Sequence, residues 1–163
     1  ETFTPGKKYN EAISVKNSGT IDTFVRVIIT KSWQDKEGKK HTELSPDLIE
    51  LNFLTDNGWQ VANAQSTRER TVLYYTKAVA AGDTAPALSD TLRINPSIAS
   101  DVTKHVTKSE KGKTITYTYK YNGYTFHIDA EVDAVQTHNA KDAIKSAWGV
   151  DVSVSDDESS IGF

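Results

Sequence analysis

Residues 113–134 alternate between apolar and polar side chains on both sides of an Asn-Gly pair. Apolar residues occupy positions 115, 117, 119 and 121 before the pair, and positions 124, 126, 128, 130 and 132 after it. A period of two is typical of a strand with one buried face. Asn122-Gly123 tolerates the positive φ angles of a type I′ turn. The segment therefore predicts a β-hairpin.

The turn also predicts the register of this hairpin. A two-residue loop pairs Tyr121 with Tyr124, and counting back from that pair places Tyr119 opposite Phe126. Both apolar sets then lie on the same side of the ribbon. We expect an antiparallel sheet that packs on a core with this side and exposes the other side to water.

Length and composition narrow the class of protein. The 163 residues suit one domain with a sizeable core. A net charge of −3 argues against nucleic acid or an anionic membrane as an electrostatic partner. No apolar run approaches the roughly 20 residues of a membrane-spanning helix. Because cysteine is absent, disulfides, thiolate metal sites and thiol catalysis are excluded.

Further strands are expected at intervals along the chain. The run 24–33 is rich in β-branched and aromatic residues and predicts a central, buried strand. Other strands are expected in 9–15, 71–79, 91–94 and 150–154, whereas 48–54 is compatible with helix or strand. Short strands separated by turn signals predict a mainly β fold, an antiparallel β-sandwich of jelly-roll or immunoglobulin-like type. We expect one domain over residues 1–155.

One helix is predicted, over residues 139–148. Asn139 is a suitable N-cap, Asp142 is placed to reach back to it, and Gly149 is a suitable stop. A single apolar stripe follows helical spacing: Ala140, Ala143, Ile144, Ala147 and Trp148. The acidic and serine-rich residues 156–163 are expected to form a frayed tail.

The chain contains no catalytic motif. There is no HExxH helix and no G-x-S-x-G elbow. With 22 acidic residues, some pair of carboxylates will lie close together, so proximity alone is no evidence for glycoside hydrolysis. We expect a protein without enzymatic activity and without a cofactor, and we assign no catalytic, cofactor-binding or metal-binding residue.

Four ionisable residues share one face of the second hairpin strand: His127, Asp129, Glu131 and Asp133. Neighbours in such a row lie roughly 7 Å apart, whereas metal ligands converge on one point from several segments. We therefore interpret the row as a solvated sheet face, with Thr116 opposite Asp129 and Thr118 opposite His127 as ordinary cross-strand partners. The remaining histidines, His41, His105 and His138, are scattered through loop-like sequence.

Three other groups have a functional and a structural interpretation. The acidic residues at 151 and 156–158 would be explained by calcium binding or by a solvated chain terminus. Their spacing is not that of an EF-hand loop, which favours the solvated terminus. A sugar-stacking platform or a core would explain Trp33, Trp59, Tyr74 and Tyr75, and strand spacing favours the core. An intramolecular isopeptide crosslink would need a lysine, an asparagine and an acid in an apolar site; Lys31, Lys77 and Asn95 are the residues considered.

Several segments in order resemble one protein family. Residues 4–20 (TPGKKYNEAISVKNSGT) resemble the "PG…v.v.N.Gt" opening of many bacterial surface β-sandwiches. Asn57-Gly58-Trp59, residues 73–77 (LYYTK) and residues 81–84 (AGDT) resemble a "W…yYY…l.pGe.T" middle. Residues 131–136 and 143–148 resemble a "v.AvQ…A..AW" end. Together, over roughly residues 4–149, the chain is similar to the TasA/camelysin-like proteins, which a SipW-type signal peptidase processes for export.

This resemblance implies a secreted jelly-roll-like β-sandwich of a Gram-positive cell surface or biofilm matrix. Some members assemble into fibres when an N-terminal segment completes the sheet of the next subunit. The absence of methionine agrees with a processed chain from which a signal peptide has been removed. The chain starts at the TPG element, without the segment that donates the strand in those fibres, which puts that mode of assembly in doubt. The metallopeptidase classification of camelysin is not carried over, because no metal-binding motif is present.

From these observations we expect a non-enzymatic structural or adhesive protein, extracellular or on the cell surface. Its partners would be itself, in a homo-oligomer or fibre, or other surface proteins and glycans, but not nucleic acid. The alternative is a β-sandwich module that binds carbohydrate or a host ligand through exposed aromatic residues.

Overall fold

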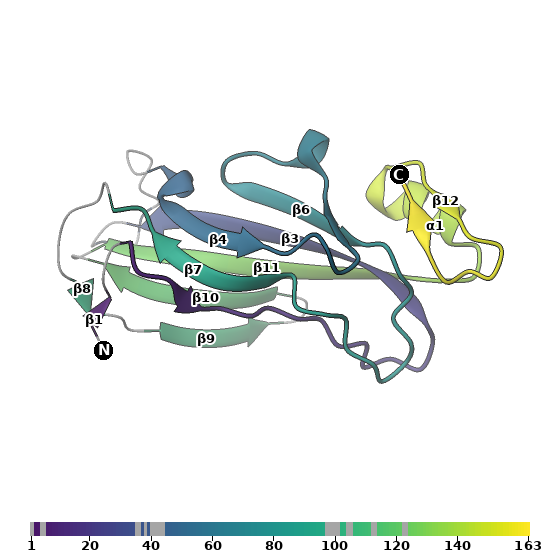
Figure 1. Cartoon of the computed structure of the whole chain (residues 1–163), viewed down its shortest axis with the longest axis horizontal. Coiled ribbons are helices and arrows are strands. Elements are labelled where there is room, and N and C mark those ends of the chain that lie inside the picture. The colour runs from purple at the N-terminus through teal and green to yellow at the C-terminus, as the bar shows by residue number, and fades with distance from the viewer. Residues whose placement is uncertain are drawn as a thin grey trace.

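The β-branched run near residue 30 forms the long strand β3 (Thr23–Gln34), which lies inside the larger of the two main antiparallel sheets. This computed structural model describes residues 2–3, 6–34, 37, 39, 45–96, 102–103, 106–111, 114–121 and 124–163, with side chains for 6–34, 37, 39, 45–96 and 126–163. The described part is mainly β, with one short α-helix near its C-terminal end (Figure 1). None of its helices is long and apolar enough to cross a bilayer.

The larger sheet has six strands in the order β5-β6-β3-β11-β10-β9. Their bounds are β5 (Trp59–Val61), β6 (Arg70–Tyr75), β11 (Tyr124–Gln136), β10 (Thr114–Tyr121) and β9 (Val106–Lys111). Strands β3 and β11 pair without interruption from Thr23–Gln136 to Gln34–Thr125. The expectation that 24–33 is a central strand is therefore confirmed.

The smaller sheet has three strands in the order β2-β7-β4. Their bounds are β2 (Tyr9–Asn10), β7 (Ser89–Ile94) and β4 (Ile49–Phe53). Two further short pairs join β1 (Thr2–Phe3) to β8 (Val102–Thr103), and β12 (Ser153–Val154) to β13 (Ile161–Gly162). Two single turns of 3-10 helix, η1 (Pro46–Leu48) and η2 (Asn63–Gln65), precede β4 and β6. Residues 48–54, for which helix and strand were both open, thus form mostly strand.

The predicted hairpin has the predicted register. Strands β10 and β11 pair Tyr121 with Tyr124 and Tyr119 with Phe126. The same register places Thr116 opposite Asp129 and Thr118 opposite His127, as expected. The turn residues Asn122 and Gly123 lie outside the described residues.

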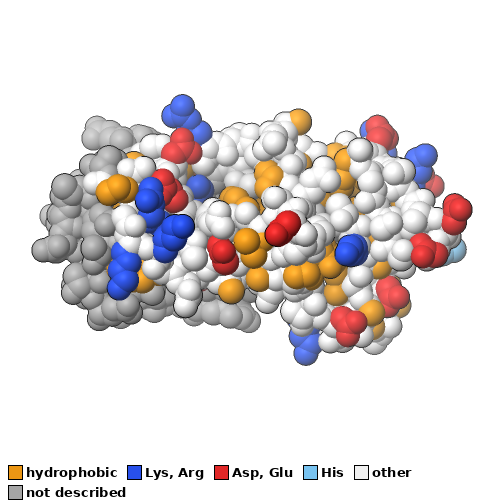
Figure 2. Space-filling view, viewed as in Figure 1, with side chains coloured by type: hydrophobic (Ala, Val, Ile, Leu, Met, Phe, Trp, Pro, Cys, Tyr) orange, Lys and Arg blue, Asp and Glu red, His pale blue; other side chains and the backbone are white. Residues whose placement is uncertain are grey.

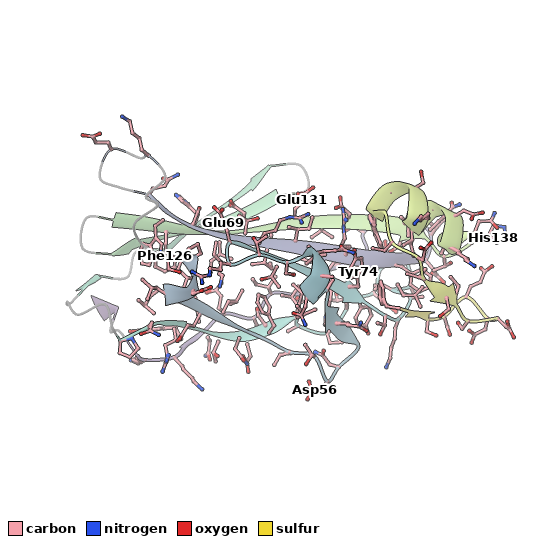
Figure 3. All side chains as sticks on the ribbon, turned by 90° about the horizontal axis from the view of Figure 1, so that it is seen from above. Asp56, Glu69, Tyr74, Phe126, Glu131 and His138 are labelled. Carbon is pink, nitrogen blue, oxygen red and sulfur yellow. The ribbon has the colours of Figure 1, made fainter. Side chains whose placement is uncertain are left out.

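The main apolar cluster is built from both sheets and lies between them. Strand β3 contributes alternate residues, Val25, Val27, Ile29 and Trp33, and every one of them is buried. The facing strands contribute Ile49 and Leu51 from β4 and Leu92 and Ile94 from β7. Phe126, Ile128 and Ala130 of β11 complete the wall on the side of the larger sheet. Side chains from the two sheets fill the space between the ribbons when the molecule is seen from above (Figure 3).

The other face of the larger sheet is not left to water along its whole length, which corrects the expectation of a fully wet back. Helix α1 (Ala140–Trp148) packs a second apolar cluster onto it. Phe24, Val72 and Tyr74 come from the sheet in this cluster, and Ile144 and Trp148 from the helix. The sequence predicted the helix and its stripe, but amphipathicity alone does not say which surface the stripe covers.

The start of the helix differs from the predicted cap. Asn139 precedes α1 with a left-handed φ of 55°, and its side chain makes no capping hydrogen bond. A capping asparagine normally has extended backbone and accepts from the helix N–H groups with its side chain. The left-handed backbone explains why the predicted interaction with the first turn does not form. The helix ends before Gly149, as expected.

The C-terminal residues are ordered by pairing rather than frayed. Ala78 N donates to Ser159 O, and Ile161 N donates to Thr76 O, each at 2.8 Å. Ile161 is 5% exposed and belongs to the cluster under α1. The expectation of a frayed tail over 156–163 is therefore wrong, because an apolar residue and the backbone after it dock on residues 76–78.

Three predicted strands are shorter than expected, and of 150–154 only Ser153–Val154 (β12) is strand. Residues 11–16 are extended and bond to the segment 84–90, for example through Leu88 N to Ile13 O at 2.8 Å, but regular pairing is limited to β2 and one bridge at Lys16. Strand β6 stops at Tyr75, and Val79 forms only an isolated bridge with Thr23.

Candidate functional site

A buried lysine lies between the two sheets. Along β3, Lys31 follows Ile29 and precedes Trp33 on the inward-facing positions, so the strand's alternation directs it into the core. It is 8% exposed. A buried ammonium is costly unless hydrogen bonds or opposite charges compensate it, so its partners matter.

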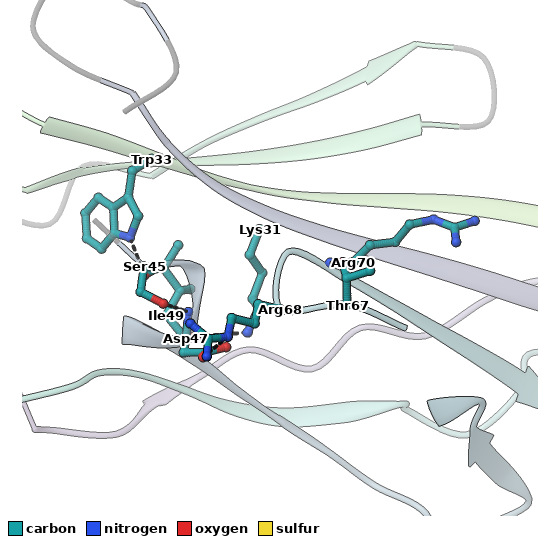
Figure 4. Close-up of polar contacts among 8 residues, drawn as sticks. All are labelled: Lys31, Trp33, Ser45, Asp47, Ile49, Thr67, Arg68 and Arg70. Atoms are coloured by element: carbon teal, nitrogen blue, oxygen red, sulfur yellow. Dashed lines mark hydrogen bonds and ion pairs between the residues drawn. The ribbon is translucent and has the colours of Figure 1, made fainter. Parts of the chain in front are cut away.

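The amine of Lys31 binds the edge of the smaller sheet. Its Nζ donates to the carbonyl oxygen of Ile49 at 2.9 Å (Figure 4). Strand β4 is the outer strand of its sheet, with β7 on one side only. Asn95 N donates to Leu48 O on the β7 side, so the alternation of an antiparallel pair directs the backbone groups of residues 49 and 51 away from β7. Lys31 thus binds an outward carbonyl of an edge strand.

The turn before this edge strand is tied to β3 in one more place and closed by its own hydrogen bonds. The backbone N–H of Ile49, the second group of this residue that points away from β7, donates to Pro46 O. The indole Nε1 of Trp33 donates to Ser45 O at 3.1 Å. Ser45 Oγ accepts from Asp47 N at 3.2 Å and caps η1. The outward groups at Ile49 are therefore satisfied within the chain.

The next outward position is different. Leu51 is 6% exposed as a residue because its side chain points into the core. The alternation of the β4–β7 pair directs its N–H and C=O away from β7, and among the described residues they form no hydrogen bond to another segment. These two backbone groups of Leu51 are therefore available for hydrogen bonds to an added strand.

Burial and charge act in opposite directions on Lys31. Burial lowers the pKa of its ammonium below the usual value, and the carboxylates of Asp47 and Glu50 oppose that shift. Glu50 itself forms a hydrogen-bonded ion pair with Arg93, which lowers the pKa of the Glu50 carboxyl. Asp47 is exposed and lies 3.6 Å from Arg68 in a surface ion pair of little energetic weight.

The geometry does not favour an isopeptide crosslink. Lys77 is exposed, at a bridge to Ser160. Asn95 donates from its amide to Glu50 at 3.2 Å, while the Lys31 amine is bonded to Ile49 O. The acid of such a site transfers protons and needs a raised pKa, whereas Arg93 holds the pKa of Glu50 low.

The ionisable row on β11 is only partly solvated. Asp133 and Arg26 form an ion pair at 2.7 Å with 14% of each side chain exposed, and Arg26 also lies over the ring of Trp148. His127 and Asp129 are half-buried, and burial lowers the pKa of His127 against the opposing charge of Asp129. Glu131 is exposed. The interpretation as a solvated face is therefore correct for Glu131 and needs correction for the other three.

The aromatic residues considered as a sugar platform are in the core. Trp33, Trp59 and Tyr74 are each 1% exposed, and Tyr75 is 7% exposed. Trp59 and Tyr75 contact each other with ring centroids 5.1 Å apart. The core interpretation is confirmed, because buried rings are not accessible to a sugar.

The C-terminal acids form local contacts. Asp157 Oδ1 accepts from Ser155, from Ser159 Oγ and from Ser159 N, which closes a turn between β12 and β13 and lowers the pKa of this carboxyl. Asp151 pairs with Lys145, and Glu158 pairs with His138. The described residues contain no group of three or more His, Asp or Glu side chains placed to hold a metal ion. His41 and His105 are not among them.

A surface pocket of about 420 Å³ lies on the smaller sheet, on the side away from the core. It is lined by Lys8, Glu50, Leu51, Asn52, Thr91 and Arg93. Acidic and basic side chains are interspersed over the face shown in Figure 2, with no extended surface of one sign. The lining offers donors and acceptors but no aromatic ring.

Comparison with known protein families, with curated proteins and with solved structures returns no match to this chain.

Sequence reasoning missed the edge at β4. The sequence left residues 48–54 open between helix and strand, and no local pattern shows that a strand will lie at the margin of its sheet. The sequence pointed to Lys31 only as a candidate for an isopeptide crosslink. Its position was nevertheless readable, because it falls on the inward period of an otherwise apolar strand.

Proposed function

We propose that this protein is a non-enzymatic, secreted structural or adhesive β-sandwich of jelly-roll or immunoglobulin-like type, of the TasA/camelysin-like group. It acts at a Gram-positive cell surface or in a biofilm matrix, and its partner is a further copy of itself. Assembly proceeds by addition of a strand at an open sheet edge, which supplies backbone hydrogen bonds without any catalytic group.

The open position at Leu51 on β4 is the observation that supports this proposal. Natural edge strands are usually covered or made short and charged, because free N–H and C=O groups recruit other strands. Strand β4 has five residues, and its apolar side chains Ile49 and Leu51 pack in the core. An added strand would extend the three-stranded sheet across this edge.

Self-association tests the proposal directly. Size-exclusion chromatography with light scattering, over a series of protein concentrations and followed by electron microscopy, should give a mass that rises with concentration toward ordered assemblies, of which a dimer is the smallest. A protein that stays monomeric over the whole series contradicts the proposal. A mass that rises only through irregular aggregates, without ordered assemblies, also contradicts it.

Ligand binding remains the second candidate, and the pocket on the smaller sheet favours it. Since the aromatic residues are buried, recognition of a glycan or host ligand there would rest on polar contacts from Lys8, Asn52 and Arg93. A glycan array that gives a signal with the native protein, and loses it with Arg93→Ala, would support this function. Thr20→Ala, at an exposed site outside that lining, is the matched control.

A further inference from the structure

We propose that two copies of the chain pair antiparallel through β4, about a two-fold axis at Leu51, and that Lys31 holds this edge partly closed. The inference rests on the proposed function and specifies its partner surface and its regulation. It follows from the direction of the backbone groups, the order of side chains in β4 and the hydrogen bond from the Lys31 amine to the Ile49 carbonyl.

The sequence of β4 is self-complementary about Leu51. Ile-Glu-Leu-Asn-Phe alternates apolar and polar positions and has the same pattern in both directions. Antiparallel pairing centred on Leu51 places Glu50 opposite Asn52, and Ile49 opposite Phe53, of the second copy. A carboxylate then faces an amide rather than another carboxylate, and apolar side chains face each other on the core side. A second copy therefore fits this edge without a like-charge contact.

The same pairing explains what Lys31 does. The two Leu51 residues would exchange N–H and C=O bonds, and the next bonds would join Ile49 of one copy to Phe53 of the other. The Ile49 carbonyl, which would accept from Phe53 N–H of the second copy, already accepts from Lys31 Nζ at 2.9 Å. The Ile49 N–H is bonded to Pro46 O. Pairing is thus free at Leu51 and blocked one step further, so Lys31 limits its length and strength.

Lys31→Met tests the lock. Methionine keeps an unbranched stem in the core and removes the donor, which leaves the Ile49 carbonyl available to Phe53 N–H of a second copy. The dimer dissociation constant, measured by sedimentation equilibrium, should fall about 30-fold relative to the native protein, because the two-fold axis frees two Ile49 carbonyls and each new backbone hydrogen bond is worth roughly fivefold. Lys77→Met is the matched control, because Lys77 is exposed and away from β4; it should leave the constant unchanged.

Cysteine pairing tests the register. Since the chain has no cysteine of its own, single substitutions give no background. Glu50→Cys mixed with Asn52→Cys should form a disulfide-linked dimer under mild oxidation, because these positions face each other in the proposed pair. Each variant alone should crosslink less. Lys77→Cys mixed with Asn52→Cys is the control pair and should crosslink least.

The outcomes separate the inference from the proposed function. Crosslinking in the 50/52 mixture together with tighter association of Lys31→Met supports both parts. If the native protein associates but the 50/52 mixture crosslinks no more than the control pair, the β4 interface is wrong and self-assembly stands. If the mixture crosslinks and Lys31→Met associates no more tightly, the lock is wrong. If neither the native protein nor Lys31→Met associates at any concentration, both the inference and the proposed function are overturned.

Discussion

At the scale of single residues, Lys31 shows how one polar side chain is accommodated in a core. Its charge is desolvated, and a single backbone carbonyl and two carboxylates at a greater distance compensate it only in part. Replacing such a buried charge with an apolar residue is often neutral or stabilising, so the lysine is not explained by stability alone. Its place at an edge carbonyl gives it a role that an apolar residue would not fill.

The charge of Lys31 should make stability depend on pH in a defined direction. Burial depresses the pKa of the folded lysine below its ordinary value of 10.5, so between these two pKa values the unfolded chain binds more protons. Stability contributed by this group therefore rises as the pH rises through that window. Urea unfolding at several pH values should show the native protein gaining free energy of unfolding relative to Lys31→Met as pH 10.5 is approached. Parallel curves for the two proteins would contradict the burial of a charged amine.

Two glycines in turns should differ in their tolerance of alanine. Gly82 has a φ of +84° and open space around it, so Gly82→Ala should cost about 1–2 kcal/mol through left-handed strain alone. Gly58 has a φ of +104°, and a Cβ there would lie 2.7 Å from Cε1 of the buried Tyr75 ring. Gly58→Ala should cost about 1–3 kcal/mol more than Gly82→Ala, since the ring must move. Chemical denaturation of both variants measures the difference, and equal losses would contradict it.

At the scale of elements, the C-terminal segment behaves as part of the fold. Residues 159–161 bond to residues 76–78, and Ile161 fills the cluster under α1. Phe163 continues the contact, with its ring centroid 4.7 Å from that of Tyr74. Helix α1 and this segment together cover part of the face of the larger sheet that the main core does not use.

A matched pair of isoleucines tests this arrangement. Ile161→Ala removes buried methyl groups and should lower the free energy of unfolding by about 2 kcal/mol or more. Ile21 is 55% exposed, and Ile21→Ala should change it by less than about 0.5 kcal/mol. Thermal or urea denaturation of the two variants gives the comparison. If Ile161→Ala were as mild as Ile21→Ala, the segment would not be docked.

Local pattern was sufficient for some of these elements and not for others. The hairpin register followed from alternation and from a two-residue loop, both of which are encoded within residues 114–136. The position of Ile161 depends on residues 76–78, far away in the chain, so nothing in the acidic segment around it indicates burial. The same applies to β4, because a strand's place at the edge of its sheet is decided by the topology of the other strands. For the candidate site, the sequence therefore indicates that Lys31 points inward, but not that Lys31 lies beside an edge strand.

At the scale of the whole molecule, the central strand pair joins distant parts of the chain. Pairing of β3 with β11 places residue 23 beside residue 136, and the strands between them are added on either side. Forming such contacts requires closure of long loops, and the entropy of closure is lost before the hydrogen bonds and apolar burial of the sheet stabilise the chain.

Folding should therefore be slow for a chain of this length, on the order of milliseconds to seconds. Trp33 and Trp59 are both 1% exposed, so their fluorescence reports the closing of the core. Stopped-flow refolding from urea, followed by this signal, measures the rate. A main phase that is complete within microseconds would contradict a folding step limited by β3–β11 pairing.

The uninterrupted β3–β11 ladder has a mechanical consequence. Twelve residue pairs in continuous register link the two longest strands, which run along the length of the molecule (Figure 1). Hydrogen bonds in an antiparallel pair lie across the strands, so a force that pulls β3 and β11 in opposite directions along their length loads all these bonds in shear at the same moment. No single bond can open first and let the others follow. The protein is thus stiffest against tension along its long axis.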